Sequence, residues 1–98
     1  MFVTEVDFVK KCRELVAEYA NKHLDQSDVN NGVVDLLEPI EVYMVWYSKS
    51  LQNHKGLFST PLSDGMYYEI TYNGDKNELY FDAYKKFENV KYDNTFKI

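Results

Sequence analysis

The chain has 98 residues, a formal net charge of −5 and 45% hydrophobic residues. This length fits one domain, residues 1–98, with a single modest core, and the composition excludes disorder over most of the chain. The acidity and the single arginine, Arg13, argue against general nucleic-acid binding, which needs Lys and Arg to neutralise phosphates.

The cellular compartment is indicated by cysteine usage and by the N-terminal segment. Cys12 is the single cysteine, so no disulfide can form within the chain, which is typical of a reducing cytosol. The first residues, MFVTEVDFVKK, contain acids and no long apolar run, so we expect no signal peptide. No stretch approaches the roughly 20 apolar residues of a membrane span. The sequence therefore predicts a cytoplasmic protein with no membrane partner.

Residues 4–24 are predicted to form an amphipathic helix. Thr4 can act as the N-cap, with Asp7 three positions later as the second half of a capping box. Apolar side chains recur at helical spacing along one stripe. The stripe consists of Phe8, Cys12, Leu15, Val16, Tyr19, Ala20 and His23.

Residues 25–39 are predicted to be a connection, and residues 40–81 an antiparallel sheet. We expect strands at 40–50, 57–60, 66–72 and 78–81, separated by turns at 52–56, 61–65 and Asn73-Gly74. In the first strand, Val42, Met44 and Trp46 alternate with Tyr43, Val45 and Tyr47, so both faces carry apolar side chains. In the third, Met66, Tyr68, Ile70 and Tyr72 share one face.

Residues 82–91 are predicted to form a short C-terminal helix. Asp82 could cap it, and Tyr84, Phe87 and Val90 follow helical spacing. The predicted fold class is therefore α+β, with an N-terminal helix, a four-stranded antiparallel meander and a short C-terminal helix.

The sequence offers no strong metal or catalytic motif. Cys12 and His23 lie eleven positions apart on one helix, about 16 Å at 1.5 Å per residue, so they cannot share an ion. His23 with Asp25 or Asp28 could form half of a metal site that His54 completes. The more ordinary role of His23 is to end the helix, where its charge suits the C-terminal end of the helix dipole. Cys12 lies on the apolar stripe, which predicts a buried, unreactive thiol. We expect no catalytic residues, no metal, no cofactor and no enzymatic activity.

Two surface features could instead bind a partner. Tyr47, Tyr67 and Tyr80 could form a stacking platform, but the basic groove of a nucleic-acid site is missing around them. The acidic residues of the first half could dock on a basic protein and imitate phosphates, although a solvated face is the commoner role of such residues. These acids are Glu14, Glu18, Asp25, Asp28, Asp35, Glu38 and Glu41.

Three sequence blocks, VWYSKSLQNHKGLFST, DGMYYEITYNGD and ELYFDAYKKFENV, resemble a family of small proteins of unknown function. That family is encoded by phages and prophages of Gram-positive bacteria, and the helix CRELVAEYANKHLDQSD is similar to its opening. The resemblance covers roughly residues 8–92 and supplies no catalytic residues. It implies a context in which small accessory proteins inhibit or modulate host proteins, CRISPR effector nucleases among them.

The leading hypothesis is therefore a phage-encoded acidic protein that occludes a host protein, with an RNA-guided nuclease as one candidate. The alternative is a phage regulatory or nucleic-acid-associated protein without enzymatic activity, which would depend on Lys85 and Lys86. An exposed strand edge could also pair with a second copy to form a homodimer. The predicted partner contacts are Tyr43, Tyr47, Tyr67, Tyr80, Asp25, Asp28 and Asp35.

Overall fold

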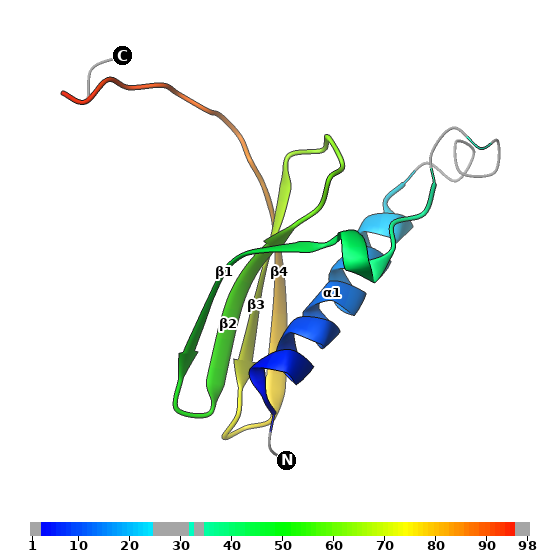
Figure 1. Ribbon diagram of the computed structural model, residues 1–98, viewed down its shortest axis with the longest axis vertical. Helices are drawn as coiled ribbons and strands as arrows, with labels where there is room; N and C mark the ends of the chain where they lie inside the picture. The colour runs from blue at the N-terminus through cyan, green and yellow to red at the C-terminus, as the bar shows by residue number, and fades with distance from the viewer. Residues whose placement is uncertain (1–2, 25–31, 33–34, 96–98) are drawn as a thin grey trace.

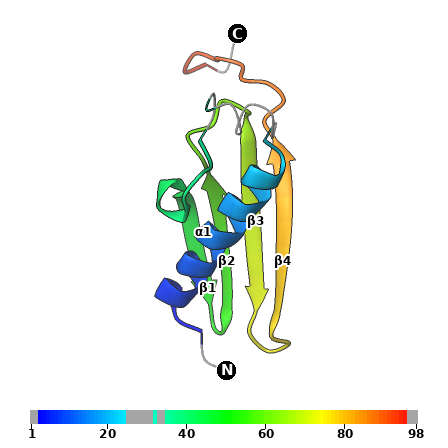
Figure 2. The same cartoon turned by 90° about the vertical axis from the view of Figure 1, so that its right-hand side faces the viewer.

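The computed structural model describes residues 3–24, 32 and 35–95. Its elements are α1 (Glu5–Lys22), the 3-10 turn η1 (Pro39–Glu41), β1 (Tyr43–Ser50), β2 (Asn53–Ser59), β3 (Met66–Asn73) and β4 (Glu78–Lys85). The strands form one antiparallel sheet in the order β1-β2-β3-β4, and α1 runs across one face of it (Figures 1 and 2). The predicted α+β class, with an N-terminal helix and a four-stranded antiparallel sheet, is confirmed.

Helix α1 begins where the sequence predicts. The hydroxyl of Thr4 accepts a hydrogen bond from the Asp7 backbone N–H at 3.1 Å, and the Asp7 carboxylate accepts one from the Thr4 N–H at 3.2 Å. This reciprocal pairing satisfies two N–H groups that the first helical turn leaves unpaired. The Thr4 hydroxyl also donates to the Asp7 carboxylate at 2.8 Å, and this bond, followed by the one from the Thr4 N–H, holds the pKa of Asp7 below its ordinary value because the ionised carboxylate is the better acceptor. The helix ends at Lys22, with His23 as its C-cap.

The core lies between α1 and the sheet face that the helix covers, which we call the helix face. Along β3, Tyr68, Ile70 and Tyr72 are buried and share this face, as predicted. Phe58 of β2 joins them. The remaining buried apolar side chains are Phe8, Cys12, Val16, Ala17 and Ala20 of α1, together with Leu37 and Val42.

The predicted turn at residues 52–56 is wrong, because β2 begins at Asn53. Ser50 pairs with Asn53, so the turn consists of Leu51 and Gln52, with Leu51 at a φ of 55°. The polar run Asn53-His54-Lys55-Gly56 resembles a turn in sequence, but His54 and Gly56 face the core. Glycine is required at 56, since an added Cβ would lie 2.7 Å from the ring of Phe58.

The predicted helix at residues 82–91 is also wrong. Residues 82–85 extend β4, where Asp82 pairs with Glu69 and Lys85 with Met66, and residues 86–95, the described part of the chain beyond it, contain no helix or strand. Phe87 is 99% exposed, so its side chain packs on nothing in this segment, and a helix this short is marginal without tertiary packing. Figure 1 shows this segment leaving the end of β4 and running away from the sheet.

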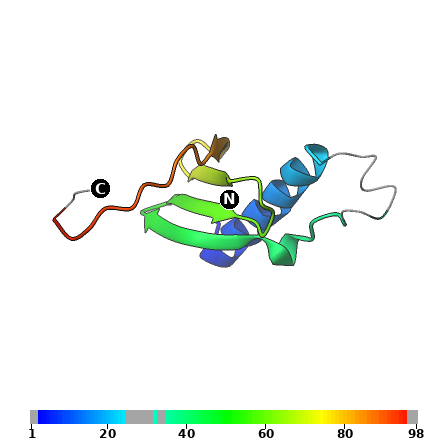
Figure 3. The same cartoon turned by 90° about the horizontal axis from the view of Figure 1, so that it is seen from above.

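The second sheet face, which we call the open face, carries no element of the described chain (Figure 3). A β-bulge in β1 decides which side chains reach it. The register of β1 against β2 shifts between Met44 and Trp46, so Met44 faces the core side with Phe58 while Trp46 faces away with Leu57. The predicted placement of Val42, Met44 and Trp46 on one face is therefore wrong at Trp46.

The connection between α1 and β1 is anchored to the helix at Asn21. Its side-chain amide donates to the Leu37 carbonyl at 2.9 Å and accepts from the Leu37 N–H at 2.7 Å. Most of the predicted connection at residues 25–39 lies outside the described residues.

None of the helices in the part of the chain that the structure describes has both the length and the apolar composition of a membrane-spanning segment.

Candidate functional site

The open face of the sheet is the strongest candidate for a functional surface, because it gathers large aromatic side chains without covering them. Side chains alternate between the two faces along each strand, and residues paired across an antiparallel ladder share a face. The register therefore assigns to the open face Tyr43 and Trp46 of β1, Leu57 of β2, Tyr67 of β3, and Tyr80 and Tyr84 of β4.

The aromatic side chains of the open face are accessible. Trp46 is 40% exposed and Tyr80 is 54% exposed, with Tyr43 and Tyr84 similarly accessible. Tyr67 is half-buried and pairs directly with Tyr84. Aromatic side chains of this kind are enriched at the cores of protein interfaces, since they bury much area with few rotatable bonds.

The charges of the open face are mainly acidic. The sole cation that the four strands place there is Lys55, and it forms an ion pair with Glu69 of β3 at 3.3 Å. Glu69 also pairs across the ladder with Asp82, which puts two like charges opposite each other. Glu78 accepts a hydrogen bond from the Tyr80 hydroxyl, and this contact raises the pKa of Tyr80. The face therefore offers aromatic rings and carboxylates.

Of the predicted tyrosines, Tyr43, Tyr67 and Tyr80 lie together on the open face, but Tyr47 does not. Tyr47 points to the opposite side, where its hydroxyl hydrogen-bonds Nδ1 of His54 and its ring packs 5.8 Å from that of Phe8. Burial, together with the charge of Glu5, raises the pKa of Tyr47. Tyr47 therefore does not belong to the stacking platform that the sequence predicted from Tyr47, Tyr67 and Tyr80.

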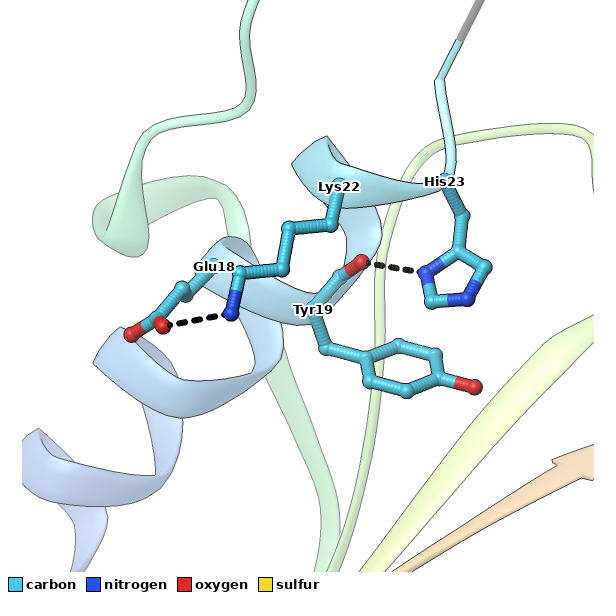
Figure 4. A network of polar contacts seen from close by, with 4 residues as sticks. All are labelled: Glu18, Tyr19, Lys22 and His23. Atoms are coloured by element: carbon cyan, nitrogen blue, oxygen red, sulfur yellow. Dashed lines mark hydrogen bonds and ion pairs between the residues drawn. The ribbon is translucent and has the colours of Figure 1, made fainter.

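The predicted acidic contacts do not join the aromatic surface. Asp35 is exposed on the connection, next to the Leu37 that Asn21 of α1 holds, so it lies on the helix side of the molecule. Asp25 and Asp28 lie outside the described residues. On α1, Glu18 is paired with Lys22 at 3.0 Å (Figure 4), which neutralises part of the predicted acidic surface.

Both histidines are engaged in hydrogen bonds within the described chain. Nδ1 of His23 lies 2.8 Å from the Tyr19 carbonyl oxygen and its ring stacks on Tyr19, as Figure 4 shows, so His23 serves the helix end. His54 is 1% exposed, with Nε2 3.1 Å from the Val3 carbonyl oxygen. In residues 3–24, 32 and 35–95, no three His, Cys, Asp or Glu side chains are grouped to hold a metal ion.

The cysteine is buried, as the sequence predicts. Cys12 is fully enclosed by the core, and this burial raises the pKa of its thiol to about 12. A thiol with such a pKa carries almost no thiolate near neutral pH, and the thiolate is the nucleophilic form.

A concave surface lies on the helix side, between α1 and η1. It is an apolar groove of about 480 Å³ whose walls include Val6, Val9, Ile40 and Met44. Arg13 also lines it, and its buried Nε has no hydrogen-bond partner. Glu5, Lys10 and Glu14 stand around the groove, so its rim has mixed charge.

Sequence reasoning missed three members of the open face: Trp46, Leu57 and Tyr84. Trp46 was assigned to the wrong side because a bulge carries no reliable local signal, and Tyr84 because its spacing fits a helix as well as a strand. Leu57 already lies in the predicted strand at 57–60, where strict alternation with Phe58 gives its face, and Tyr84 could have been found by extending the strand at 78–81 by a few residues.

Comparison with known families gives one result. Residues 9–94 match a family described as "Family of unknown function (DUF6275)". Neither the curated proteins nor the solved structures gave a match. The match spans most of the chain, and the protein therefore belongs to this family of unknown function.

Proposed function

We propose that the protein is a non-enzymatic binding protein that docks on another protein through the open face of its sheet. The observation that carries the proposal is the uncovered aromatic surface formed by Tyr43, Trp46, Tyr67, Tyr80 and Tyr84. A sheet with one apolar face on a core normally exposes polar side chains on the other. An aromatic patch in that position is typical of a protein interaction site.

The charge of the open face favours a protein partner with basic side chains. Lys55 is already paired with Glu69, so the face has no unpaired cation in the four strands to hold a phosphate backbone. Asp82 and Glu78 are available to accept from Lys or Arg of a partner, and the tyrosine rings can stack on guanidinium groups.

The resemblance to proteins of phages and prophages supports a narrower form of this proposal. In that context the partner is a host protein that the small protein inhibits by occlusion, and a CRISPR effector nuclease is one such host protein. RNA-guided nucleases hold nucleic acid in positively charged channels, which suits an acidic, aromatic ligand. The acidic surface around Asp35 would be a separate docking side, because it lies on the helix side of the sheet.

A quantitative pull-down tests the proposal and tells the two sides apart. Tagged wild-type protein, a Trp46→Ser/Tyr80→Ser variant and an Asp35→Lys/Glu38→Lys variant are used as baits in lysate from a Gram-positive host that carries a CRISPR system. We expect one stoichiometric protein that the serine variant loses and the lysine variant retains. If only the lysine variant fails to recover the partner, the binding site lies on the acidic surface around Asp35 instead of the open face. Recovery of nucleic acid instead of protein would favour the regulatory alternative, and Lys85→Glu/Lys86→Glu would then identify its contacts.

A further inference from the structure

The two edges of the sheet differ in how well they are protected against pairing. Within the described chain, β4 pairs with β3 and with nothing on its outer side. It runs for eight residues, Glu78–Lys85, in unbroken register and without proline. The opposite edge strand, β1, carries the bulge at Val45. Bulges and short edge strands are devices that prevent edge-to-edge pairing, and β4 has neither.

An apolar strip lies directly beside the β4 edge on the helix face. Leu79 is exposed and Phe81 is half-buried, and with Leu15 and Tyr19 of α1 they line a groove of about 210 Å³. The ring of Phe81 packs 5.2 Å from that of Tyr19, so this strip continues the core outward to the edge. An added strand here would gain main-chain hydrogen bonds and cover apolar surface together.

We propose that a second copy of this chain occupies the edge, so that β4 pairs antiparallel with β4 of the second copy. The two-fold axis is perpendicular to the sheet, because that is the symmetry that reverses strand direction while keeping both helices on the same side. The result is one eight-stranded sheet. Its two grooves meet on the helix side, and its two open faces become continuous on the other.

The charges of β4 exclude two of the registers near the middle of the strand. The symmetry allows pairings in which one residue faces its own counterpart on the axis. With Asp82 on the axis, two carboxylates face each other, and with Tyr80 on the axis, Glu78 faces Asp82 twice. Like charges directly opposite each other are destabilising.

With Phe81 on the axis, these like-charge contacts disappear. Phe81 then faces Phe81 of the second copy, Leu79 faces Ala83, and Tyr80 faces Asp82. The pairs on the helix face are apolar, and those on the open face place a tyrosine hydroxyl beside a carboxylate. An axis at Leu79 or Ala83 also avoids like charges, but it lies nearer an end of β4 and pairs fewer of its residues. We therefore assign the axis to Phe81.

Sedimentation velocity over a wide range of protein concentration tests the dimer, without any partner of the proposed function. Tyr80→Asp would place two carboxylates opposite each other on each side of the axis, so we expect the dimer dissociation constant to rise about tenfold or more. Tyr43→Asp is the matched control, since Tyr43 is a similarly exposed tyrosine of the same face on the other edge. A monomer at all concentrations, or a dimer that Tyr43→Asp weakens as much as Tyr80→Asp, would overturn the proposal.

Disulfide trapping tests the register. Phe81→Cys places two thiols across the axis, whereas the Cα atoms of two Asp82→Cys residues would be about 8 Å apart, beyond the roughly 7 Å that a disulfide spans. We expect oxidation to cross-link the first variant and not the second. If Phe81→Cys fails to fold, a mixture of Leu79→Cys and Ala83→Cys chains should cross-link where either chain alone does not. Wild-type protein is the control for Cys12, and cross-linking of Asp82→Cys in preference would refute the assigned register.

Discussion

The hydroxyl of Tyr47 in β1 donates a hydrogen bond to Nδ1 of His54 in β2 beneath the start of α1. The direction follows from the other ring nitrogen: Nε2 of His54 lies 3.1 Å from the Val3 carbonyl oxygen, which can only accept. When the ring carries a single proton, that proton is therefore on Nε2, and Nδ1 is the acceptor. Phe8 stacks on the imidazole with ring centroids 5.2 Å apart. This network joins the segment before α1 to the sheet.

Tyr47→Phe removes the hydroxyl and leaves Nδ1 of the buried His54 without its donor. We expect the free energy of unfolding to fall by about 1–3 kcal/mol, the usual cost of an unsatisfied buried polar atom. Urea unfolding followed by circular dichroism measures this change. Tyr43→Phe is the control and should alter stability by less than about 0.5 kcal/mol, because Tyr43 is exposed. Equal effects of the two substitutions would show that the buried hydrogen bond contributes nothing.

Asn21→Asp should release the connection before β1 from α1. The amide of Asn21 matches both the N–H and the carbonyl of Leu37, but a carboxylate would present an acceptor to that carbonyl. We expect a loss of about 1–3 kcal/mol in unfolding free energy and faster hydrogen exchange at the Leu37 amide. Asn89→Asp introduces the same charge on the exposed C-terminal segment and should leave both quantities unchanged. Unaltered protection of the Leu37 amide in Asn21→Asp would contradict this role.

Much of the fold could be predicted from the sequence, because the strongest local patterns coincide with burial. The capping box at Thr4 and Asp7 marks the start of α1, and the alternation through Tyr68 and Ile70 marks the central strand. These elements have one polar and one apolar side, so periodicity alone assigns both their type and their orientation.

The rest could not be predicted because it depends on tertiary neighbours. The bulge at Val45 reverses the side to which Trp46 points, and nothing in the local residues signals it. Tyr84 and Phe87 are three apart, which fits a helix, but pairing with Tyr67 holds Tyr84 in a strand. Of the four tyrosines predicted as partner contacts, Tyr43, Tyr67 and Tyr80 lie on the open face, and Tyr47 lies on the helix face.

Alkaline pH should destabilise the protein through Cys12. Burial raises the pKa of this thiol from its ordinary 9.0 to about 12, so the folded state retains a proton that the unfolded state loses. The stabilisation is complete below about pH 9 and decreases as the pH rises toward 12, by up to about 1.4 kcal/mol per pH unit. We expect Cys12→Ala to flatten this decline in urea unfolding measured from pH 7 to 11.

Part of the alkaline decline should remain in Cys12→Ala, because burial, with the charge of Asp64, also raises the pKa of Tyr68 to about 12. Adding Tyr68→Phe to Cys12→Ala should remove the remaining decline in the free energy of unfolding. Tyr84→Phe is the control for an exposed tyrosine and should leave the slope unchanged. A decline as steep in Cys12→Ala as in the wild type would rule out the thiol as its source.

A proline in the C-terminal segment distinguishes the extended chain of the structure from the helix that the sequence predicts. Glu88→Pro would break a helix over residues 82–91 and cost about 3 kcal/mol or more, since proline removes a helical hydrogen bond and clashes with the preceding turn. In the irregular segment it removes no ladder hydrogen bond, and its neighbour Phe87 is already 99% exposed. We therefore expect a midpoint of thermal unfolding within a degree or two of the wild type. Thr71→Pro is the positive control, because Thr71 is paired with Lys55 of β2 and with Tyr80 of β4, so proline there removes a ladder hydrogen bond. A large fall in the midpoint for Glu88→Pro would mean that the segment folds as a helix against the sheet after all.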